Sequence, residues 1–272
     1  MKPPLTYYGG KQRLAERILA MSPPHEIYCE PFFGGGAVFF RKYKSAVEVI
    51  NDHDNDLINF YSCVQGRFDE LEALVQQTLC SETMYRHAKD IWNARVESSD
   101  VERAWAVWLI TNGSYGGSMH GGWKWCNGVS GSHAGVYLNI KRNLFSRRLK
   151  ERLSEVQICC RDALDVIGDR DTSRTFFYLD PPYPGCYQQH YSGYTVKDLA
   201  RLLDLLSGIK GKFILSNYWS QTLKFHVIKN GWNYRVIEMP LIASRDRGRT
   251  RNEVLVYNYI TEPSLFDGQW KI

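Results

Sequence analysis

Two blocks of the chain alternate apolar segments of strand length with helical patterns, and this alternation constrains the fold most. The first block runs from Ile27 to about Tyr61, and the second begins near Val156. Strands that alternate with helices form a parallel or mixed sheet that helices cover on both faces. The sequence therefore predicts an α/β domain assembled from two separated segments.

The pattern within each block predicts individual elements. In the first block we expect strands over Glu26–Pro31 and Ala46–Ile50, and helices over Ala37–Tyr43 and Asn55–Val64. Asp54 and Asp56 suit the start of the second helix as capping carboxylates. In the second block we expect strands over Phe176–Leu179, Phe213–Ser216 and Glu253–Tyr259, and a helix over Val196–Leu206.

The stretch between the two blocks lacks this alternation of strands and helices. It predicts helices over Phe68–Leu79, Glu82–Arg95 and Val101–Thr111, an irregular segment over Asn112–Asn139, and a basic helix over Lys141–Leu153. An interruption of about 90 residues in an α/β pattern is typical of an inserted domain. We therefore assign residues 1–62 and 155–272 to one domain and residues 63–154 to a mostly helical insert.

Composition limits the classes of protein that fit. The chain has 272 residues, 44% of them hydrophobic, which suffices for a globular core. The net charge of +5 permits a polyanionic partner without requiring one. The seven cysteines have irregular spacing with no C-x-x-C pair, so we expect reduced thiols and no metal site. Without a signal-peptide pattern or a long apolar run, the expectation is a cytoplasmic protein with no membrane partner.

A glycine-rich turn follows the first predicted strand. Its sequence runs from Glu30 to Gly36 as Glu-Pro-Phe-Phe-Gly-Gly-Gly. Glycines let the backbone turn tightly and approach a ligand closely at the carboxyl edge of a parallel sheet. An ordinary strand-to-helix turn would also use them. Asp52, just after the second predicted strand, suits hydrogen bonding to ribose hydroxyls.

The strongest chemical signal is the tetrapeptide Asp180-Pro181-Pro182-Tyr183 at the end of an apolar strand. Methylation of an aromatic amine requires that its N–H groups be held, so that the nitrogen lone pair is freed for attack. A carboxylate and a backbone carbonyl accept both N–H bonds, two prolines fix the direction of the carbonyl, and an aromatic ring stacks on a flipped base. The alternative is a proline-rich turn in which Asp180 is only a turn residue.

These motifs occur in a characteristic order: Tyr7-Tyr8-Gly9-Gly10-Lys11, then the turn from Glu30 to Gly36, then Asp52, then the insert, then the tetrapeptide. The set resembles the alpha group of DNA adenine-N6 methyltransferases, the family of the Dam enzymes, over nearly the whole chain. Ile214-Leu215-Ser216-Asn217 and the segment from Arg245 to Glu253 add to the resemblance. Two departures are Tyr7, where the family often has Trp, and the run of three glycines.

The resemblance implies a Rossmann-like sheet of seven strands, a target-recognition insert, and S-adenosylmethionine as cofactor. By motif, the residues implied in cofactor binding are Tyr7, Lys11, Glu30, Pro31, Phe32, Gly34, Gly36, Asp52, Asp162 and Asp180. Asp180 and the Pro181 carbonyl would hold the N6 amine of an adenine flipped out of double-stranded DNA. Pro182 would complete the catalytic tetrapeptide, and Tyr183 would stack on the base. Transfer would be direct, with no metal and no covalent intermediate.

Three segments are candidates for DNA binding. The irregular segment offers polar side chains that suit base edges and a lysine that suits phosphate, and two basic stretches suit the backbone. The candidates are Asn112, Ser114, Tyr115, Lys124, Lys141, Arg142, Arg245, Arg247, Arg249 and Arg251. For the basic stretches the alternative is a solvated charged face, and we assign Trp92, Trp105 and Trp108 to helix packing.

Other functions remain open at this point. An RNA adenine or the amide of a protein glutamine could be the acceptor, although protein-glutamine enzymes typically carry Asn where this chain has Asp180. A catalytically silent DNA-binding protein is the alternative from another class. The intact tetrapeptide, glycines and Asp52 favour an enzyme. The sequence does not decide between a monomer and a dimer.

Overall fold

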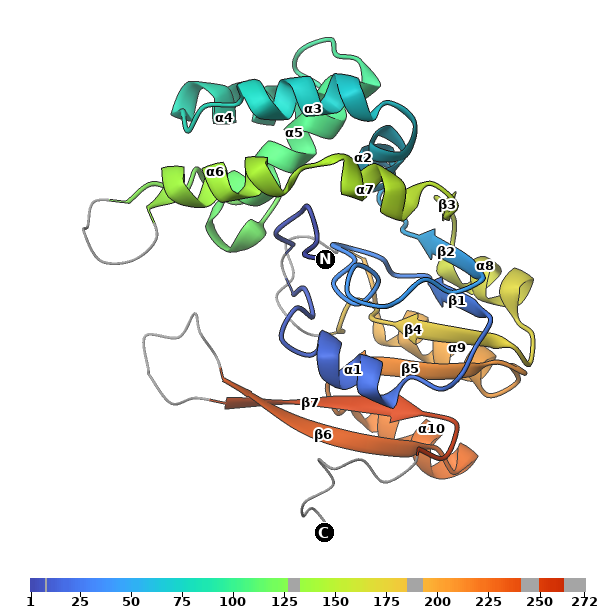
Figure 1. Ribbon diagram of the computed structural model, residues 1–272. Coiled ribbons are helices and arrows are strands. Elements are labelled where there is room, and N and C mark those ends of the chain that lie inside the picture. Colours follow the sequence, from blue (N-terminus) through green and yellow to red (C-terminus); the bar gives the residue numbers. More distant parts are fainter. Residues whose placement is uncertain (8, 127–132, 185–192, 241–249, 262–272) are drawn as a thin grey trace. The chain divides into compact units, whose positions relative to one another are not determined.

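The computed structural model describes residues 1–7, 9–126, 133–184, 193–240 and 250–261 (Figure 1). It contains a seven-stranded sheet in the order β3-β2-β1-β4-β5-β7-β6. The strands are β1 (Ile27–Glu30), β2 (Val47–Asn51), β3 (Gln157–Cys159), β4 (Thr175–Leu179), β5 (Lys212–Asn217), β6 (Asn233–Pro240) and β7 (Thr250–Tyr257). The α/β fold with a seven-stranded sheet is thus confirmed.

Strand directions decide which residues meet at one edge. β1 pairs parallel with β4, and β4 parallel with β5, with Leu179 opposite Leu215. β7 runs antiparallel to β5 and places Val254 opposite Asn217. The start of β7 therefore lies beside the carboxyl end of β5. Residues just after β4 and residues at the start of β7 consequently belong to the same edge of the sheet.

The chain forms two compact units. The first comprises Met1–Ala15, Phe33–Tyr43 and Val49–Asp162, and the second Glu16–Phe32, Lys44–Glu48 and the chain from Ala163. Helices assigned wholly to the first unit are α2 (Asn55–Gly66), α3 (Phe68–Gln77), α4 (Glu82–Trp92), α5 (Asp100–Gly113), α6 (Ala134–Leu144) and α7 (Arg147–Leu153), with a 3₁₀ turn, η1 (Tyr115–Gly117). The other helices are α1 (Ala15–Met21), α8 (Ala163–Arg170), α9 (Val196–Leu206) and α10 (Gln221–Asn230).

Helix α5 is the centre of the helical part of the first unit. Every residue from Ala104 to Asn112 is buried, so the helix has no solvent-facing side over this stretch. A helix that is buried all round is a core helix, and α2, α3 and α4 pack against it. Phe145 adds to this core by stacking on Phe68, with ring centroids 5.4 Å apart. Trp105 and Trp108 are buried in the helix, as expected.

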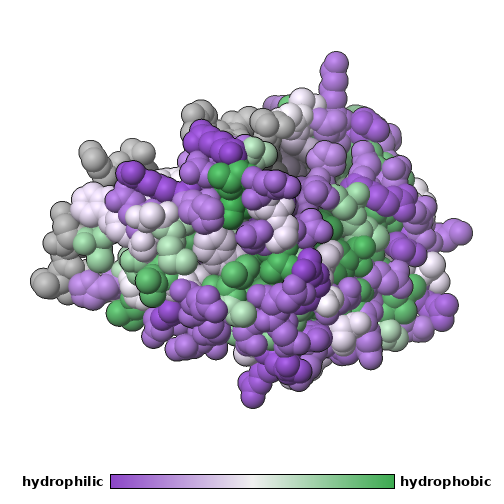
Figure 2. All heavy atoms as spheres, turned by 90° about the horizontal axis from the view of Figure 1, so that it is seen from above, coloured by the Kyte–Doolittle hydropathy of each residue, from purple (hydrophilic) through white to green (hydrophobic). Residues whose placement is uncertain are grey.

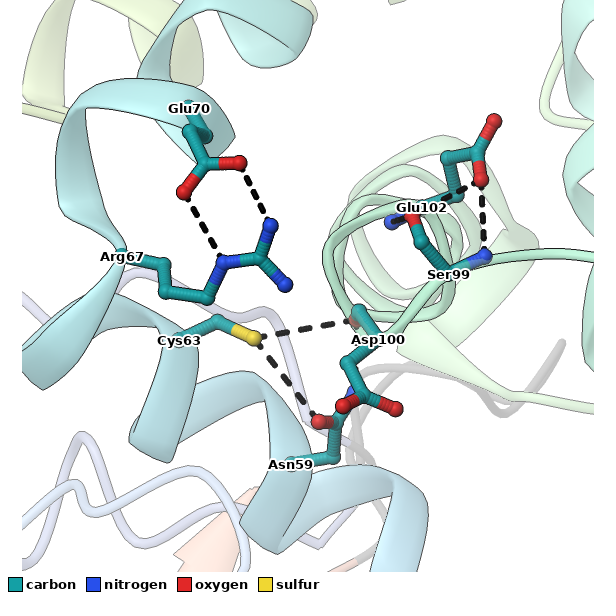
Figure 3. Close-up of polar contacts among 7 residues, drawn as sticks. All are labelled: Asn59, Cys63, Arg67, Glu70, Ser99, Asp100 and Glu102. Atoms are coloured by element: carbon teal, nitrogen blue, oxygen red, sulfur yellow. Dashed lines mark hydrogen bonds and ion pairs between the residues drawn. The ribbon is translucent and has the colours of Figure 1, made fainter.

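The start of α5 is fixed by capping and by side chains of α2 (Figure 3). Ser99 and Glu102 form a capping box, in which each side chain accepts the other residue's backbone N–H. Asn59 Nδ2 donates to the Asp100 backbone oxygen at 2.8 Å, and Cys63 Sγ lies 3.7 Å from that oxygen. The capping box satisfies two backbone N–H groups at the helix start, and the contacts from α2 add hydrogen bonds to the Asp100 carbonyl.

Two expected helices differ from those observed. Ala37–Tyr43 is not a helix but a series of turns, in which Phe40 N–H bonds to Gly36 O while Arg41 N–H bonds to Val38 O. Ala37, Val38, Phe39 and Phe40 are all buried, as they could also be in a core helix, so it is the mixture of hydrogen bonds to residues three and four positions back that defines the turns. The basic stretch 141–153 is divided between α6 and α7, because the backbone becomes extended at Phe145, whose side chain is buried.

The face of the molecule in Figure 2 is mostly hydrophilic, and hydrophobic side chains show between the polar ones. Within the described ranges, no helix has the length and apolar character to cross a bilayer. The same part of the chain holds no group of three or more His, Cys, Asp or Glu side chains suited to a metal ion.

Candidate catalytic and cofactor-binding residues

The tetrapeptide begins directly after β4 in the second unit, where all five strand residues are buried. Tyr183 is also buried, at 8% exposure. Its hydroxyl lies 3.0 Å from Asp180 Oδ1 and 2.9 Å from Glu253 Oε1, on β7. Its ring packs edge-on against Tyr218, with centroids 4.5 Å apart. The tetrapeptide therefore has a fixed geometry in which Asp180 and Tyr183 contact each other.

Three carboxylates of the second unit act on one buried tyrosine. Burial, and then the charge of Asp180, raise the pKa of Tyr178 well above its ordinary value, and the charges of Glu30 and Glu253 add to the effect. Glu30 is itself buried and accepts a hydrogen bond of 2.7 Å from the Tyr28 hydroxyl. A concentration of negative charge in a poorly solvated place favours a cationic or electron-poor ligand group.

The glycine turn in the first unit is fixed at three points. Gly34 N–H donates to Asp52 Oδ2 at 2.8 Å, and Gly34 O accepts from the Tyr61 hydroxyl at 3.0 Å. Phe33 N–H bonds to the backbone oxygen of Asn51, the last residue of β2, at 2.9 Å. Gly34 and Gly36 have φ of 49° and 64°, which favours glycine at both positions. The turn is thus held to the end of β2, as a ligand cradle requires.

Asp52 is the buried acid of this turn. Its Oδ1 accepts the Asp54 N–H at 3.1 Å, in addition to the Gly34 contact. Burial raises its pKa to about 6, and the hydrogen bonds from the backbone N–H groups of Gly34 and Asp54 partly oppose the rise. A buried carboxylate that already accepts backbone N–H groups is oriented for further donors such as hydroxyls.

The N-terminal motif contributes to the same unit. Tyr7 lies against the turn so closely that a Cβ on Gly35 would be 2.7 Å from Tyr7 Cβ. Lys11 is buried, and its ammonium group donates to the Gly9 backbone oxygen at 3.2 Å. The first unit therefore brings Tyr7, the glycine turn and Asp52 together. Tyr8 lies outside the described residues.

The remaining cofactor candidates are placed separately. Asp162 is exposed and directly precedes α8. The segment before it is held by Asn51, whose side chain bonds to both the N–H and the oxygen of Arg161, at 3.0 and 3.1 Å. In the second unit Pro31 is buried, and the half-buried Phe32 ring meets Tyr194 edge-on.

Sequence reasoning did not find Tyr61, Asn51 or Glu253. Tyr61 lies inside a regular helix, and Asn51 precedes the more conspicuous Asp52. Glu253 lies within β7, and an acidic residue beside an apolar strand segment is ordinarily expected to be solvated. Only the polar residue at a strand end, Asn51, carried a signal that could have been used.

The structure assigns core roles to two of the DNA-binding candidates. Asn112 is 2% exposed, and its amide donates to the backbone oxygens of Pro4 and Trp108 and accepts from the Thr6 hydroxyl. Ser114 is also buried. Asn112 forms hydrogen bonds inside the first unit and Ser114 is buried there, so in this conformation neither side chain is accessible to a base edge.

Four other candidates differ in how much solvent they meet. Tyr115 is 51% exposed, and its hydroxyl donates to the Trp125 backbone oxygen. The ammonium groups of Lys124 and Lys141 lie 4.4 and 5.7 Å from the Tyr137 ring centroid. Lys141 is buried, whereas Arg142 donates to the Thr78 and Gln76 backbone oxygens.

The late arginine cluster falls outside this description. Arg245, Arg247 and Arg249 lie outside the described residues, and of Arg251 only the place in β7 is described. The prediction that this cluster binds DNA therefore stays a prediction. Its sequence position, immediately before and within β7, is the only structural statement that applies to it.

Comparison with known proteins agrees with this chemistry. The family described as D12 class N6 adenine-specific DNA methyltransferase matches residues 7–233, most of the chain. Type II methyltransferase M.MjaIII of Methanocaldococcus jannaschii is 27% identical over 294 residues, covering 95% of this chain and 99% of that protein. The DNA adenine methylase of Escherichia coli strain K12 is 26% identical, covering 83% and 86% of the two chains.

Two further similarities are more limited. The DNA N-6-adenine-methyltransferase of Escherichia phage P1 is 32% identical over 89% of this chain, which spans 33% of that longer protein. The solved precorrin 8w decarboxylase from Methanobacterium thermoautotrophicum has a TM-score of 0.40 at 11% identity, covering 96% of both chains. On the strength of the family match from residue 7 to residue 233, the chain belongs to the D12 class N6 adenine-specific DNA methyltransferases.

Proposed function

We propose that this protein transfers a methyl group from S-adenosylmethionine to the N6 amine of an adenine that is flipped out of a specific sequence in double-stranded DNA. The observation that carries the proposal is the fixed geometry of the tetrapeptide, in which Tyr183 bonds to Asp180 directly after a buried strand. Family membership supports the acceptor atom and DNA as substrate. We place the reaction in the cytoplasm, where DNA and the methyl donor are both available.

In the proposed reaction Asp180 and the Pro181 carbonyl accept the two N–H groups of the amine. This turns the nitrogen lone pair away from the ring and toward the methyl group, which it attacks in line. As the new N–C bond formed, the bond between the methyl carbon and the donor sulfur would break with its electron pair left on sulfur, and the positive charge on the nitrogen would persist until one N–H proton passed to water. The carboxylates of Asp180 and Glu30, which already act on Tyr178, would stabilise that charge. Pro182 holds the backbone, and the Tyr183 ring stacks on the base.

The residues of the first unit fit the cofactor. Side chains at Gly35 and Gly36 would collide with Tyr7 and Phe33, so these glycines let the turn pack closely against its own neighbours. Asp52 would hold the ribose, with the glycines and Tyr7 at the methionine part and Lys11 and Asp162 as further contacts. By motif, Glu30, Pro31 and Phe32 of the second unit are also proposed as cofactor contacts. When bound, S-adenosylmethionine supplies the electrophilic methyl group.

We assign residues 63–154 to target recognition and residues 1–62 and 155–272 to catalysis. Tyr115 and Lys124 are the candidates of the insert with the best access to DNA, since Tyr115 is half exposed and Lys124 is only partly covered. Arg245, Arg247, Arg249 and Arg251 would bind phosphates. Asn112 would instead support the recognition segment from the interior.

The proposal is tested by incubating the protein with S-adenosylmethionine and unmethylated genomic DNA and mapping modified bases by single-molecule sequencing. N6-methyladenine confined to one short motif is the expected result. Scattered methylation would contradict specific readout while leaving the chemistry. Transfer only to RNA or to a protein amide would refute the DNA assignment, and cofactor binding without any transfer would point to a silent DNA-binding protein.

A further inference from the structure

The acidic residue at the start of β7 has no role in the reaction assigned so far. Glu253 is 7% exposed and lies on a strand whose register places its neighbour Val254 opposite Asn217 of β5. Since β5 pairs parallel with β4, the register puts Glu253 at the edge where the tetrapeptide begins. Burial of a carboxylate is costly and is rarely found without a specific partner.

Among the described residues, one such partner is the tetrapeptide's tyrosine. Glu253 Oε1 lies 2.9 Å from the Tyr183 hydroxyl, which lies 3.0 Å from Asp180 Oδ1. Burial, followed by the charges of Asp180 and Glu253, raises the pKa of Tyr183 well above its ordinary value, so the hydroxyl keeps its proton. The phenol has one proton, which it shares between Asp180 Oδ1 and Glu253 Oε1 or donates to one of them at a time, and both contacts restrict its rotation about the C–O bond.

We infer that Glu253 is a positioning residue for methyl transfer, which acts through the Tyr183 hydroxyl to orient the Asp180 carboxylate and the tyrosine ring. The inference rests on the proposed function, because orientation of Asp180 matters only if Asp180 holds the amine. The mechanical reason is that β7 is a paired strand, flanked by β5 and β6. A contact from such a strand fixes a loop side chain more firmly than a contact within the loop.

This role differs from that of a residue that only stabilises the fold. Substitution of a residue that only stabilises the fold would lower the free energy of unfolding and leave the rate per folded molecule unchanged. Substitution of a positioning residue lowers the rate at saturating cofactor and leaves cofactor affinity unchanged. Because Glu253 acts through one hydroxyl, removal of that hydroxyl should make the identity of residue 253 unimportant.

The experiment compares Glu253→Ala, Glu253→Gln, Tyr183→Phe and the double variant Tyr183→Phe/Glu253→Ala with the wild type. Single-turnover methyl transfer to DNA is measured at saturating S-adenosylmethionine, and cofactor affinity is measured by calorimetry. Glu238→Ala is the matched control, since Glu238 is an exposed glutamate on the adjacent strand β6. Thermal unfolding identifies the folded fraction of each variant, to which the rates are normalised.

We expect Glu253→Ala and Tyr183→Phe each to slow transfer about 10-fold, the loss for one buried hydrogen bond, with cofactor affinity within about twofold of wild type. Glu253→Gln, which offers both a donor and an acceptor to the hydroxyl, should return to within about threefold. The double variant should be no more than about twofold slower than Tyr183→Phe.

Three results would overturn the inference. The first is a double variant whose fold-decrease in rate equals the product of the two single decreases. The others are a Glu253→Gln variant as slow as Glu253→Ala, and a loss confined to cofactor affinity. Failure of the proposed function is a separate result. It would appear in the wild type, as cofactor binding without methylation of DNA, whereas failure of the positioning role appears only as ratios between active variants.

Discussion

The backbone N–H of Gly34 donates a hydrogen bond of 2.8 Å to the Asp52 carboxylate, and so joins the glycine turn to the acid that follows β2. The Asp52 carboxylate thus holds the glycine turn, and under the proposed function it also accepts hydrogen bonds from the ribose of the cofactor. The protonation state of Asp52 therefore bears on both the shape of the turn and its affinity for the ligand.

The affinity for S-adenosylmethionine should weaken as the pH falls through about 6, the pKa to which burial raises Asp52. Ribose hydroxyls donate to the ionised carboxylate, so binding lowers this pKa and is coupled to proton release. Affinity therefore rises with pH up to about 6 and is constant above it. Calorimetric titrations from pH 5 to pH 8 measure this. Asp52→Asn should bind weakly and without this pH dependence, and an equal slope in that variant would contradict the assignment.

Removal of the Tyr61 hydroxyl should loosen the glycine turn. Tyr61 is fully buried, and its hydroxyl donates to Gly34 O at 3.0 Å. Tyr61→Phe leaves this carbonyl without that donor and should lower the free energy of unfolding by about 1 kcal/mol, with a loss of cofactor affinity. Urea unfolding and calorimetry check both effects. Tyr43→Phe is the control, because Tyr43 is 96% exposed, and the same loss there would dismiss the interpretation.

A side chain at Gly36 should be poorly tolerated. Gly36 has φ of 64°, and a Cβ there would lie 2.6 Å from Phe33 Cζ and 3.0 Å from the Phe40 ring. Gly36→Ala should cost about 2 kcal/mol of stability through backbone strain and the collision. Gly66→Ala provides the comparison, since nothing lies within 4 Å of its Cβ position in α2. The free energy of unfolding of that variant, measured by thermal unfolding, should rise by about 0.5 kcal/mol. A similar loss of stability in both variants would show that the collision at Gly36 is not the cause.

Local patterns predicted those elements that local interactions stabilise. Helix α9 was predicted at its observed limits, Val196–Leu206, because its apolar face repeats at helical spacing and Thr195 caps it. Asp54 caps α2 as expected, by accepting the N–H groups of Asp56 and Leu57. The helix predicted after the glycines was wrong, because a run of buried apolar residues suits a core helix and a series of turns equally well.

In the candidate site, too, residues that depend on local sequence were predictable and residues brought together by tertiary contacts were not. The tetrapeptide was predictable because its functional groups are consecutive in the chain. Tyr61 was not, since it meets Gly34 from 27 residues away through the packing of α2. Glu253 was not, since only the register of β7 on β5 brings it near Asp180. A single sequence contains no direct record of either pairing.

Substitution of Asp180 should abolish catalysis and spare cofactor binding. Asp180→Ala removes the carboxylate that accepts the amine N–H, and the methyl-transfer rate should fall on the order of 10³-fold or more. The dissociation constant for S-adenosylmethionine, measured by calorimetry, should change by less than about threefold. Near-normal turnover in this variant would disprove the proposed mechanism, and Asp180→Asn, which keeps one oxygen acceptor, should retain more activity than the alanine variant.

Replacement of Lys141 by methionine should stabilise the protein near neutral pH. Burial, and then the charge of Lys2, lower the pKa of Lys141 to about 8. A base with a lower pKa in the folded state binds fewer protons there than in the unfolded state. Stability is therefore reduced below pH 8, and the reduction disappears as the pH rises toward the ordinary lysine value of about 10.4.

The gain for Lys141→Met should be about 1–3 kcal/mol at pH 7 and close to zero above pH 10. Urea unfolding at the two pH values measures it. Lys197→Met, at an exposed position of α9, should change the free energy of unfolding by less than about 0.5 kcal/mol at either pH. A gain for Lys141→Met that does not depend on pH would mean that packing, and not the buried charge, is responsible.

The contact between Tyr183 and Glu253 joins positions that are 70 residues apart in the chain. A lineage that exchanges the tyrosine for phenylalanine loses the hydroxyl that the buried Glu253 contacts. The two positions should then drift together, with an apolar residue replacing the glutamate wherever the hydroxyl is lost. Enzymes that keep the phenol should retain Glu or Gln at the start of the last strand, so this pair of alignment columns would distinguish subgroups among relatives that share the same tetrapeptide chemistry.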